Sequence, residues 1–225
     1  MAQYLGIDVM SYPGDSTMAW LWAHGFRVTG FYLNHRRGGP EDDSWISHHP
    51  ILANAGWGLA PLYLGWQTVD NQGHHLPAPS NPSSTAATDV TETVTLMNKA
   101  GFAAGTVVYI DIEDGTVPSG NYDMYLTDWI TGIRVQGFVP GVYCSHLCIA
   151  WATSKHVPIW SVHIGDNSGG PYDPSNLPIT LDPGCIGTQF RQEKLLNGLP
   201  LQLDLDCFTV PDPSSGVAAS QLVHG

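Results

Sequence analysis

Two carboxylates stand at the end of the stretch VVYIDIEDG, which runs from Val107 to Gly115. Its valine, tyrosine and isoleucine residues are typical of a buried β-strand. Such a strand should not carry Asp111 and Glu113 without a function, because removing a charge from water is costly. A protonated acid beside an ionised carboxylate is the equipment of glycoside hydrolysis, so the pair indicates acid–base chemistry on a sugar.

Strand alternation predicts where this pair points. Side chains two residues apart on a strand share a face, so Asp111 and Glu113 lie on the same face as Tyr109. The opposite face is apolar and is predicted to pack on helices; it consists of Val108, Ile110 and Ile112. We therefore predict that both carboxylates point into the interior of the fold, at the carboxyl end of their strand.

Two further strands are predicted to send carboxylates to the same place. Asp8 alternates with apolar neighbours near the start of the chain, and Asp204 and Asp206 alternate with leucines near its end. Carboxylates held close together raise one another's pKa, so one of them can stay protonated near neutral pH. Single aspartates at strand ends often cap a loop, which is sufficient to explain Asp114 or Asp166.

The elements that must position these residues follow a regular order. Four helix-like stretches end in glycine and an aromatic residue (AHGF, NAGW, KAGF, VQGF), and a strand follows each. Glycine after the last turn is a helix-end signal. Strands are predicted over 4–11, 27–33, 58–66, 106–113 and 139–145, and helices over 15–25, 44–56, 84–101, 121–137 and 146–156. This succession predicts a parallel sheet with right-handed crossovers.

The last third of the chain lacks such helices. Strands are predicted over 158–165, 185–190 and 201–209, with Gly-, Pro-, Asn- and Asp-containing links between them. We predict an α/β fold, a TIM-like (β/α) barrel with eight strands and outer helices missing from the last third. One domain spans 1–210, and a flexible tail covers 211–225. An open doubly wound sheet is the alternative, but SYPGD, after the first strand, lacks a dinucleotide-binding glycine pattern.

The composition argues against several partners. The chain has 8 basic and 20 acidic residues, a formal net charge of −12, so nucleic acid is not expected, because phosphate contacts need Lys and Arg. No apolar run reaches the ~18–20 residues that cross a bilayer, so membrane insertion is not expected. We predict a monomer without a signal peptide. It would stay in the cytoplasm or leave by another route, as phage lysins and secretion-system effectors do.

Cysteine spacing gives a weak metal signal. The CSHLC motif holds Cys144 and Cys148, but structural zinc sites usually have a second close ligand pair, and Cys185 and Cys207 are far apart in the sequence. We therefore expect buried thiols, or a disulfide if the final compartment is oxidising. Neither a metal nor another cofactor is expected.

Six motifs, in order, resemble the family 25 glycoside hydrolases, which are lysozyme-like muramidases. They are GIDV (6–9), YIDIED (109–114), PGVYCS (140–145), PIWSVHIG (158–165), GTQF (187–190) and LDLDCF (203–208). The chain more closely resembles the divergent Rv2525c-like, glycoside-hydrolase-like group. The resemblance spans about residues 4–209. It implies a barrel whose final strands lack helices, and peptidoglycan or a related glycan as substrate.

The resemblance also implies roles by position. Glu113 would be the general acid, and Asp111 would stabilise the developing cation or orient water or the N-acetyl group. Asp8 and Asp204 would complete the acidic floor. The residues assigned to substrate binding are Tyr32, Tyr63, Tyr143, Trp160, Gln189 and Asp206. The chain departs from the muramidases at Asp206, where they tend to have asparagine, and in its long, His-rich loop 70–85.

Two other functions stay open from the sequence alone. A barrel that kept the groove but lost turnover would bind cell-wall polysaccharide. A metal-dependent phosphodiesterase would hold a hard cation with four carboxylates, those of Asp8, Asp111, Glu113 and Asp204. His24 or His163 could then bind the phosphate, if they reach the rim of the barrel. The Cα atoms of Asp111 and Glu113 should lie roughly 6.5–7 Å apart, which does not decide between a retaining and an inverting reaction.

Overall fold

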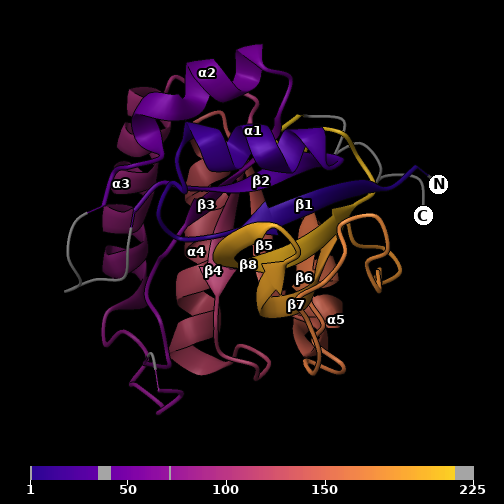
Figure 1. Cartoon of the computed structure of the whole chain (residues 1–225). Coiled ribbons are helices and arrows are strands. Elements are labelled where there is room, and N and C mark those ends of the chain that lie inside the picture. The colour runs from indigo at the N-terminus through magenta and orange to yellow at the C-terminus, as the bar shows by residue number, and fades with distance from the viewer. Residues whose placement is uncertain (1, 35–41, 71, 216–225) are drawn as a thin grey trace.

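The computed structural model describes residues 2–34, 42–70 and 72–215, and within them eight strands close into a barrel in chain order (Figure 1). The strands are β1 (Tyr4–Asp8), β2 (Phe26–Tyr32), β3 (Gly58–Tyr63), β4 (Val107–Ile112), β5 (Val139–Ser145), β6 (Ile159–Val162), β7 (Gly187–Leu196) and β8 (Leu199–Phe208). Strands β1 to β7 pair in parallel, whereas β8 is antiparallel to both β7 and β1. The predicted eight-stranded α/β barrel is confirmed.

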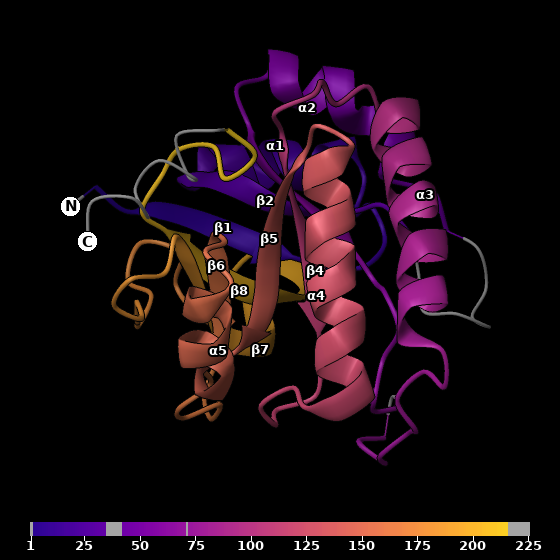
Figure 2. The ribbon, with the colours of Figure 1, turned by 180° about the vertical axis from the view of Figure 1, so that it is seen from behind.

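Helices follow each of the first five strands. They are α1 (Asp15–Ala23), α2 (His49–Asn54), α3 (Pro82–Ala100), α4 (Gly120–Val135) and α5 (Ile149–Ser154), with 3₁₀ turns η1 (Ile46–His48) and η2 (His146–Cys148). Figure 2 shows α3 and α4 side by side on one flank of the barrel. In the described residues after β6 no outer helix forms, as predicted. None of the described helices combines the length and apolar character that a membrane span requires.

Alternation along the strands divides the apolar core into two layers. One layer packs between strands and helices and includes Ile7, Val108 and Ile110. The other fills the barrel interior and consists of Val28, Ala60, Leu62, Val107, Tyr109, Tyr143, Trp160, Ile186 and Phe208. The Trp160 ring lies edge-on to Tyr109, with ring centroids 6.1 Å apart. Because these rings fill the interior, any cavity at the mouth has a solid floor.

The last two strands form a longer hairpin than the sequence suggested. Residues 191–200, predicted as a link, belong mostly to β7 and β8, which meet at Asn197 and Gly198. An Asn-Gly pair between strands is a strong hairpin signal, and Gly198 has a φ of 91°, which favours glycine. The second half of β7 is largely exposed and contains the charged run RQEK, so it lacks the apolar pattern by which a strand is predicted.

Residues 211–215, predicted as part of a flexible tail, are hydrogen-bonded to the barrel. The Tyr109 hydroxyl donates to the Pro213 carbonyl (2.8 Å), and the Val107 N–H donates to the Ser214 carbonyl (2.8 Å). The backbone runs so close to β3 that a Cβ on Gly58 would lie 2.0 Å from the Pro211 oxygen. The domain therefore extends at least to Ser215, and the rest of the predicted tail lies outside the described residues.

A chain truncated after Val210 is expected to be less stable than one truncated after Ser215. The shorter chain leaves the N–H groups of Leu59 and Val107 and the Tyr109 hydroxyl without their partners. Each lost partner of a buried donor costs roughly 1–3 kcal/mol, so the free energy of unfolding should fall by roughly 3 kcal/mol or more. Urea unfolding of the two chains measures the difference, and equal midpoints would contradict it.

Candidate active site

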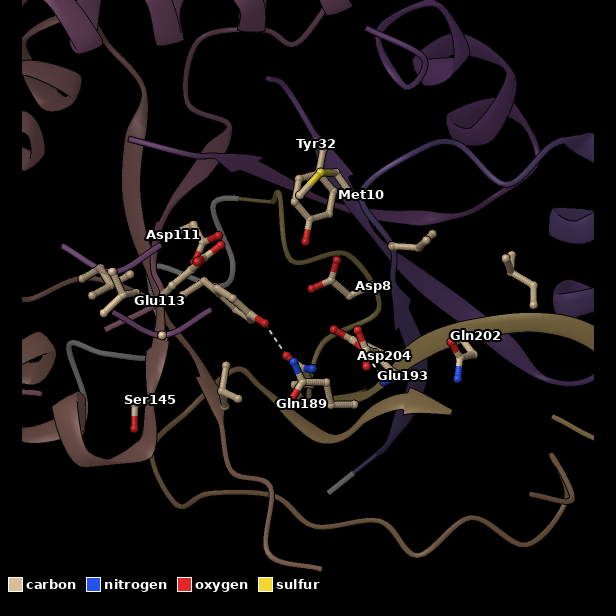
Figure 3. Close-up of a pocket in the computed structure, with 18 of the residues that line it drawn as sticks. Asp8, Met10, Tyr32, Asp111, Glu113, Ser145, Gln189, Glu193, Gln202 and Asp204 are labelled. Carbon is tan, nitrogen blue, oxygen red and sulfur yellow. Dashed lines mark hydrogen bonds between the residues drawn. The ribbon is translucent and has the colours of Figure 1, made fainter. Parts of the chain in front are cut away.

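A cavity of about 1000 Å³ opens at the carboxyl ends of the parallel strands (Figure 3). In α/β barrels this end carries the active site. Its volume is at the upper end of the ~300–1,000 Å³ found for small-molecule sites, so it accommodates a ligand larger than one sugar ring. Seven predicted site residues line it: Asp8, Tyr32, Asp111, Glu113, Tyr143, Gln189 and Asp204.

The floor of the cavity is acidic. Asp8 at the end of β1 pairs in register with Asp204 on β8. Asp8 is 1% exposed, and neither of its carboxylate oxygens has a hydrogen bond of ordinary geometry within the described part of the chain. Gly30 on β2 makes room for it, because a Cβ there would lie 3.0 Å from Asp8 Oδ1 and 3.3 Å from the Trp160 ring. The barrel is therefore built around a buried carboxyl group that its packing does not require.

Burial governs the protonation of Asp8. Desolvation raises its pKa well above the usual range, and the charges of Asp204 and Asp111 raise it further. The nearby hydroxyls of Tyr32 and Tyr143 oppose this rise. Burial also raises the pKa of both tyrosines, with the Asp8 charge as the next cause. The tyrosines therefore stay protonated and can donate hydrogen bonds to a carboxylate or a ligand.

The other two aspartates of the last strand also hold protons more tightly than usual. Burial raises the pKa of Asp204 to about 6, against the opposing hydrogen bonds from the Glu193 N–H and the Gln189 side chain. Burial, followed by the charges of Asp8 and Asp204, raises the pKa of Asp206. The carboxyl groups of the floor therefore keep their protons to a higher pH than carboxyl groups on the protein surface would.

Asp111 and Glu113 occupy different environments at the end of β4. Asp111 lies within the strand and is 3% exposed, whereas Glu113 follows the last strand residue, Ile112, and is exposed. Figure 3 shows the two carboxyl groups together on one side of the cavity, with Asp8 and Asp204 across from them. A ligand in the cavity can therefore meet one buried and one accessible carboxyl group along the same strand.

A hydrogen bond closes the wall between β5 and β7. The Tyr143 hydroxyl donates to Oε1 of Gln189, as the dashed line in Figure 3 shows. Both side chains are almost completely buried, although both line the cavity. Their positions agree with the predicted substrate groove, and they present polar atoms at its base.

The prediction for Tyr63 is wrong. Its side chain points to the helices, where the hydroxyl donates to Glu92 Oε2 (2.6 Å) and the ring stacks on Trp129. Leu62 and Ala60 face the interior in its place. The resemblance gave the position of Tyr63 on β3 but not the face of the strand, which is set by alternation.

The predicted substrate contacts of Trp160 and Asp206 are also wrong. Both side chains are fully buried and do not line the cavity. The Trp160 indole N–H donates to Asp206 Oδ1 (3.0 Å), and its ring packs edge-on against Tyr143 with centroids 4.5 Å apart. They form a layer beneath the cavity, so they support Tyr143 instead of contacting a ligand.

The described residues offer no ligand set for the phosphodiesterase hypothesis. Among them, no three His, Cys, Asp or Glu side chains are arranged to hold a metal ion. His24 stacks on Trp20 at the end of α1, and neither His24 nor His163 lines the cavity. The cysteines are all buried free thiols: Cys144, Cys148, Cys185 and Cys207.

The sequence between residues 18 and 176 matches the family model described as "Rv2525c-like, glycoside hydrolase-like domain". The chain belongs to this family. The matched segment holds Asp111, Glu113, Tyr32 and Tyr143, whereas Asp8 and Asp204 lie outside it. The structure brings the two groups together, since β1 and β8 close the barrel. No curated protein matches the chain in sequence.

Solved structures with the same fold include proteins from bacteria and a bacteriophage. The Tat-secreted protein Rv2525c of Mycobacterium tuberculosis, in complex with L-tartrate, is 19% identical, with 93% of this chain and 96% of that one covered and a TM-score of 0.63. The catalytic domain of the endolysin ply40 from Listeria monocytogenes bacteriophage P40 is 12% identical (coverage 100% and 98%, TM-score 0.60). The autolysin LytC of Streptococcus pneumoniae, solved with a synthetic peptidoglycan ligand, is 13% identical (coverage 92% and 46%, TM-score 0.63). These similarities establish a shared fold.

In this Rv2525c-like domain the hairpin of β7 and β8 builds a cavity wall that the sequence analysis missed. Its contribution is Gln192, Glu193, Leu195, Pro200, Leu201 and Gln202. Glu193 has a φ of 52° at an irregular position of β7, and its N–H donates to Asp204 Oδ1 (2.7 Å). The Asn-Gly turn could have revealed the hairpin, but nothing in the sequence marks the bulge at Glu193.

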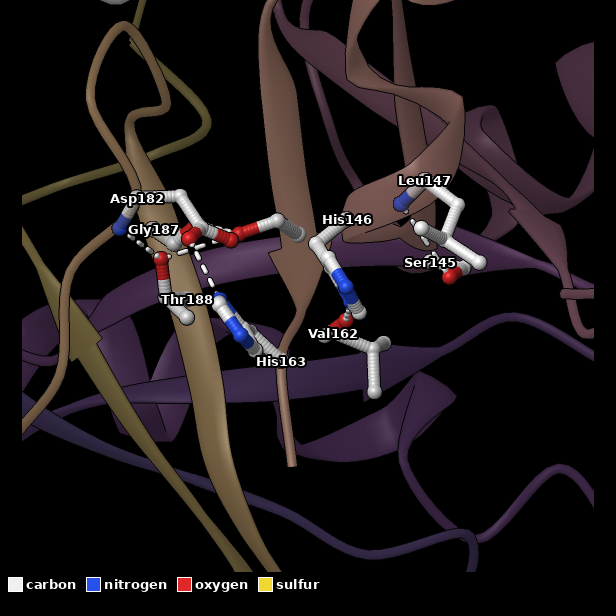
Figure 4. Close-up of polar contacts among 9 residues, drawn as sticks. Ser145, His146, Leu147, Val162, His163, Asp182, Gly187 and Thr188 are labelled. Atoms are coloured by element: carbon white, nitrogen blue, oxygen red, sulfur yellow. Dashed lines mark hydrogen bonds and ion pairs between the residues drawn. The ribbon is translucent and has the colours of Figure 1, made fainter. Parts of the chain in front are cut away.

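A pair of histidines lies next to the cavity of this Rv2525c-like domain (Figure 4). The rings of His146 and His163 stack with centroids 4.0 Å apart. His163 Nδ1 lies 2.7 Å from Oδ1 of Asp182, a nearly buried residue whose other oxygen has no hydrogen bond within the described residues. Ser145 and Val162, the residues before the two histidines, line the cavity. The pair therefore braces the ends of β5 and β6.

His163→Phe is expected to destabilise the protein although it preserves the ring stack. The change removes the N–H donor of Asp182 and leaves that carboxylate poorly paired, a loss of about 1–2 kcal/mol. His146→Phe is the matched control, because it keeps the stack and does not touch Asp182. Thermal unfolding of both variants measures the effect, and equal losses would show that the Asp182 contact is unimportant.

Proposed function

We propose that this protein hydrolyses glycosidic bonds of bacterial cell-wall peptidoglycan, as a lysozyme-like muramidase. Membership of a glycoside-hydrolase-like family supports the general class of reaction. The observation that carries the proposal is the meeting of Asp8, Asp111, Glu113 and Asp204 in one cavity at the carboxyl end of the barrel. Four carboxyl groups from three strands have no packing function there, whereas glycoside hydrolysis needs at least two.

The proposed reaction divides the work between the carboxyl groups. Glu113, accessible at the rim, donates its proton to the glycosidic oxygen as the bond from C1 to that oxygen breaks. Asp111, held in the strand, stabilises the positive charge that develops on the ring or orients water or the N-acetyl group. Water then adds its hydroxyl to C1, and its proton restores Glu113. Asp8, whose pKa burial raises well above its usual range, keeps its proton and donates a hydrogen bond to the sugar instead of repelling Asp111, whereas Asp204 is protonated only below its pKa of about 6.

Peptidoglycan as the substrate is supported by proteins that share the fold. They include a phage endolysin domain and an autolysin solved with a synthetic peptidoglycan ligand. Another, Rv2525c, is described as Tat-secreted. We therefore propose that this protein acts at the cell wall, outside the cytoplasm.

The direct test is release of soluble fragments from purified peptidoglycan. A fall in turbidity, with muropeptides that carry a new reducing sugar end by mass spectrometry, is the expected result. Fragments that differ only by cut peptide bonds, or no fragments at all, would contradict the proposal. Borohydride reduction of the products separates these cases, because it labels only reducing sugar ends.

The exposure of Glu113 favours one second function, a barrel that binds wall glycan with little or no turnover. A general acid is effective when the bound sugar shields it from water, so a groove that fails to cover Glu113 would bind without cleaving. Pull-down on insoluble peptidoglycan distinguishes the two functions. Retention of the protein with no soluble fragment over days would favour binding alone.

A further inference from the structure

The two carboxylates of β4 stand where that strand loses its neighbour on one side. Strand β3 pairs with β4 at Leu62–Tyr109 and Tyr63–Ile110 and then ends. On the other side β5 stays paired as far as Ile112. The segment from Asp111 to Glu113 therefore needs another partner on its β3 side to keep a strand conformation.

That partner is the side chain of Gln67. Its Nε2 donates to the Asp111 carbonyl (2.9 Å), and its Oε1 accepts from the Glu113 N–H (3.2 Å). In a parallel ladder the C=O of one residue and the N–H two residues later face the same neighbouring strand. The Gln67 amide thus takes the place of the N–H and C=O of one residue of β3. It is only 9% exposed, so water competes weakly for these bonds.

The loop that carries Gln67 is itself held on both sides. The Trp66 N–H donates to the Tyr125 hydroxyl (2.9 Å), which donates to Oδ2 of the fully buried Asp89 (2.6 Å). Gly65 permits this approach, because a Cβ there would lie 2.3 Å from the Tyr125 oxygen. On the far side the Thr68 hydroxyl donates to Asp114 Oδ2 (2.9 Å). A buried chain of contacts thus fixes Gln67 relative to α3 and α4.

We infer that Gln67 is a positioning residue for the reaction proposed above, fixing the spacing and direction of Asp111 and Glu113. The inference rests on the proposed function for its catalytic consequence. Both hydrogen bonds of the Gln67 side chain go to the backbone of the two acidic residues, and Gln67 does not line the cavity, so it acts on their placement and not on the sugar. Misplacing a reacting group by about 1 Å costs about a hundredfold in rate. Loss of the clamp should therefore lower kcat far more than it raises KM.

Gln67→Met tests this role, because methionine has a similar length and volume but neither donates nor accepts at these positions. Its kcat on peptidoglycan should fall about 10- to 100-fold, with KM within about threefold of the native value. Ser161→Ala is the control, since it removes a buried hydrogen bond to Thr188 on β6 and β7, away from the cavity and from the Gln67 loop. It should lose a similar amount of stability and keep its kcat. Equal kcat losses in the two variants, or an unchanged kcat in Gln67→Met, would overturn the inference.

Amide hydrogen exchange keeps this test separate from that of the proposed function. The Glu113 N–H should exchange at least about tenfold faster in Gln67→Met than in the native protein or in Ser161→Ala. An inactive native protein would defeat the proposed function, but this exchange rate would still decide whether Gln67 holds the segment. If Gln67→Met does not fold, Gln67→Asn serves instead, because its amide is one methylene too short to reach both the Asp111 carbonyl and the Glu113 N–H.

Discussion

Glu113→Gln is expected to lower the rate of peptidoglycan hydrolysis by about 10²–10⁴-fold, the contribution typical of a general acid. Glutamine has nearly the same size but holds no transferable proton. Because Glu113 is exposed, the substitution should leave the fold and the melting temperature nearly unchanged. Initial rates of reducing-end formation, measured with saturating substrate, give the size of the loss.

Two other variants serve as a control and as a test of a competing general acid. Glu92→Gln removes a carboxylate outside the barrel, where Glu92 accepts a hydrogen bond from the Tyr63 hydroxyl. This variant should hydrolyse peptidoglycan at the native rate. Asp204→Asn tests the competing assignment, since its raised pKa of about 6 would also suit a general acid. Full activity in Glu113→Gln together with a large loss in Asp204→Asn would move the acid role to Asp204.

Asp204→Asn is also expected to stabilise the protein at neutral pH. Burial raises the pKa of Asp204 to about 6 in the folded state, against about 3.9 in the unfolded chain. Ionising this half-buried group therefore costs up to about 3 kcal/mol at pH 7, which asparagine avoids. For a chain of this size the melting temperature should rise by roughly 6–12 °C. The oxygen that accepts the Glu193 N–H is retained in asparagine.

The sign of the pH dependence follows from the same shift. A carboxyl group with a raised pKa in the folded state favours folding fully below about pH 4, and this contribution disappears as the pH rises to about 6. The native protein should lose stability across this window, and Asp204→Asn should lose less. Asp173→Asn is a control of opposite sign, because hydrogen bonds from Ser175 lower the pKa of this exposed residue. A native stability that rises from pH 4 to pH 6 more steeply than that of Asp204→Asn would contradict this account.

This trade of stability for function is what an active site is expected to show. Strain and buried charge persist at functional sites because the rest of the fold compensates for them. Asp8 fits the same pattern, since Gly30 leaves room for its carboxylate where an alanine would pack. Asp8→Asn should therefore also stabilise the fold.

Much of the fold could be predicted because the responsible signals are local. Glycine after the last helical turn located the helix ends, and alternation placed Asp8, Asp111 and Asp204 inside the barrel. The meeting of these three carboxyl groups in one place then followed from closure of the barrel, since β8 pairs with β1. Alternation would also have excluded Tyr63 from the groove, because its neighbour Leu62 faces the interior.

Other features depend on contacts between distant residues and leave no local pattern. Gln67 lies in a loop, and its role appears only when that loop meets the end of β4. Residues 211–215 have the Pro- and Ser-rich composition of a frayed end, yet they form hydrogen bonds with Leu59 of β3 and Tyr109 of β4. The bulge at Glu193 forms because β7 and β8 lose register. In each case hydrogen bonds formed across the fold outweigh local preference.

The central claim is that a glycosidic bond is cleaved between the carboxyl groups of β4. A crystal structure of Glu113→Gln with a bound chitin or muropeptide fragment tests it most directly. The account predicts a glycosidic oxygen within about 3 Å of the side chain of residue 113, with the adjoining sugar ring beside Asp111. A fragment bound outside the cavity, or with every glycosidic oxygen out of reach of residue 113, would contradict it.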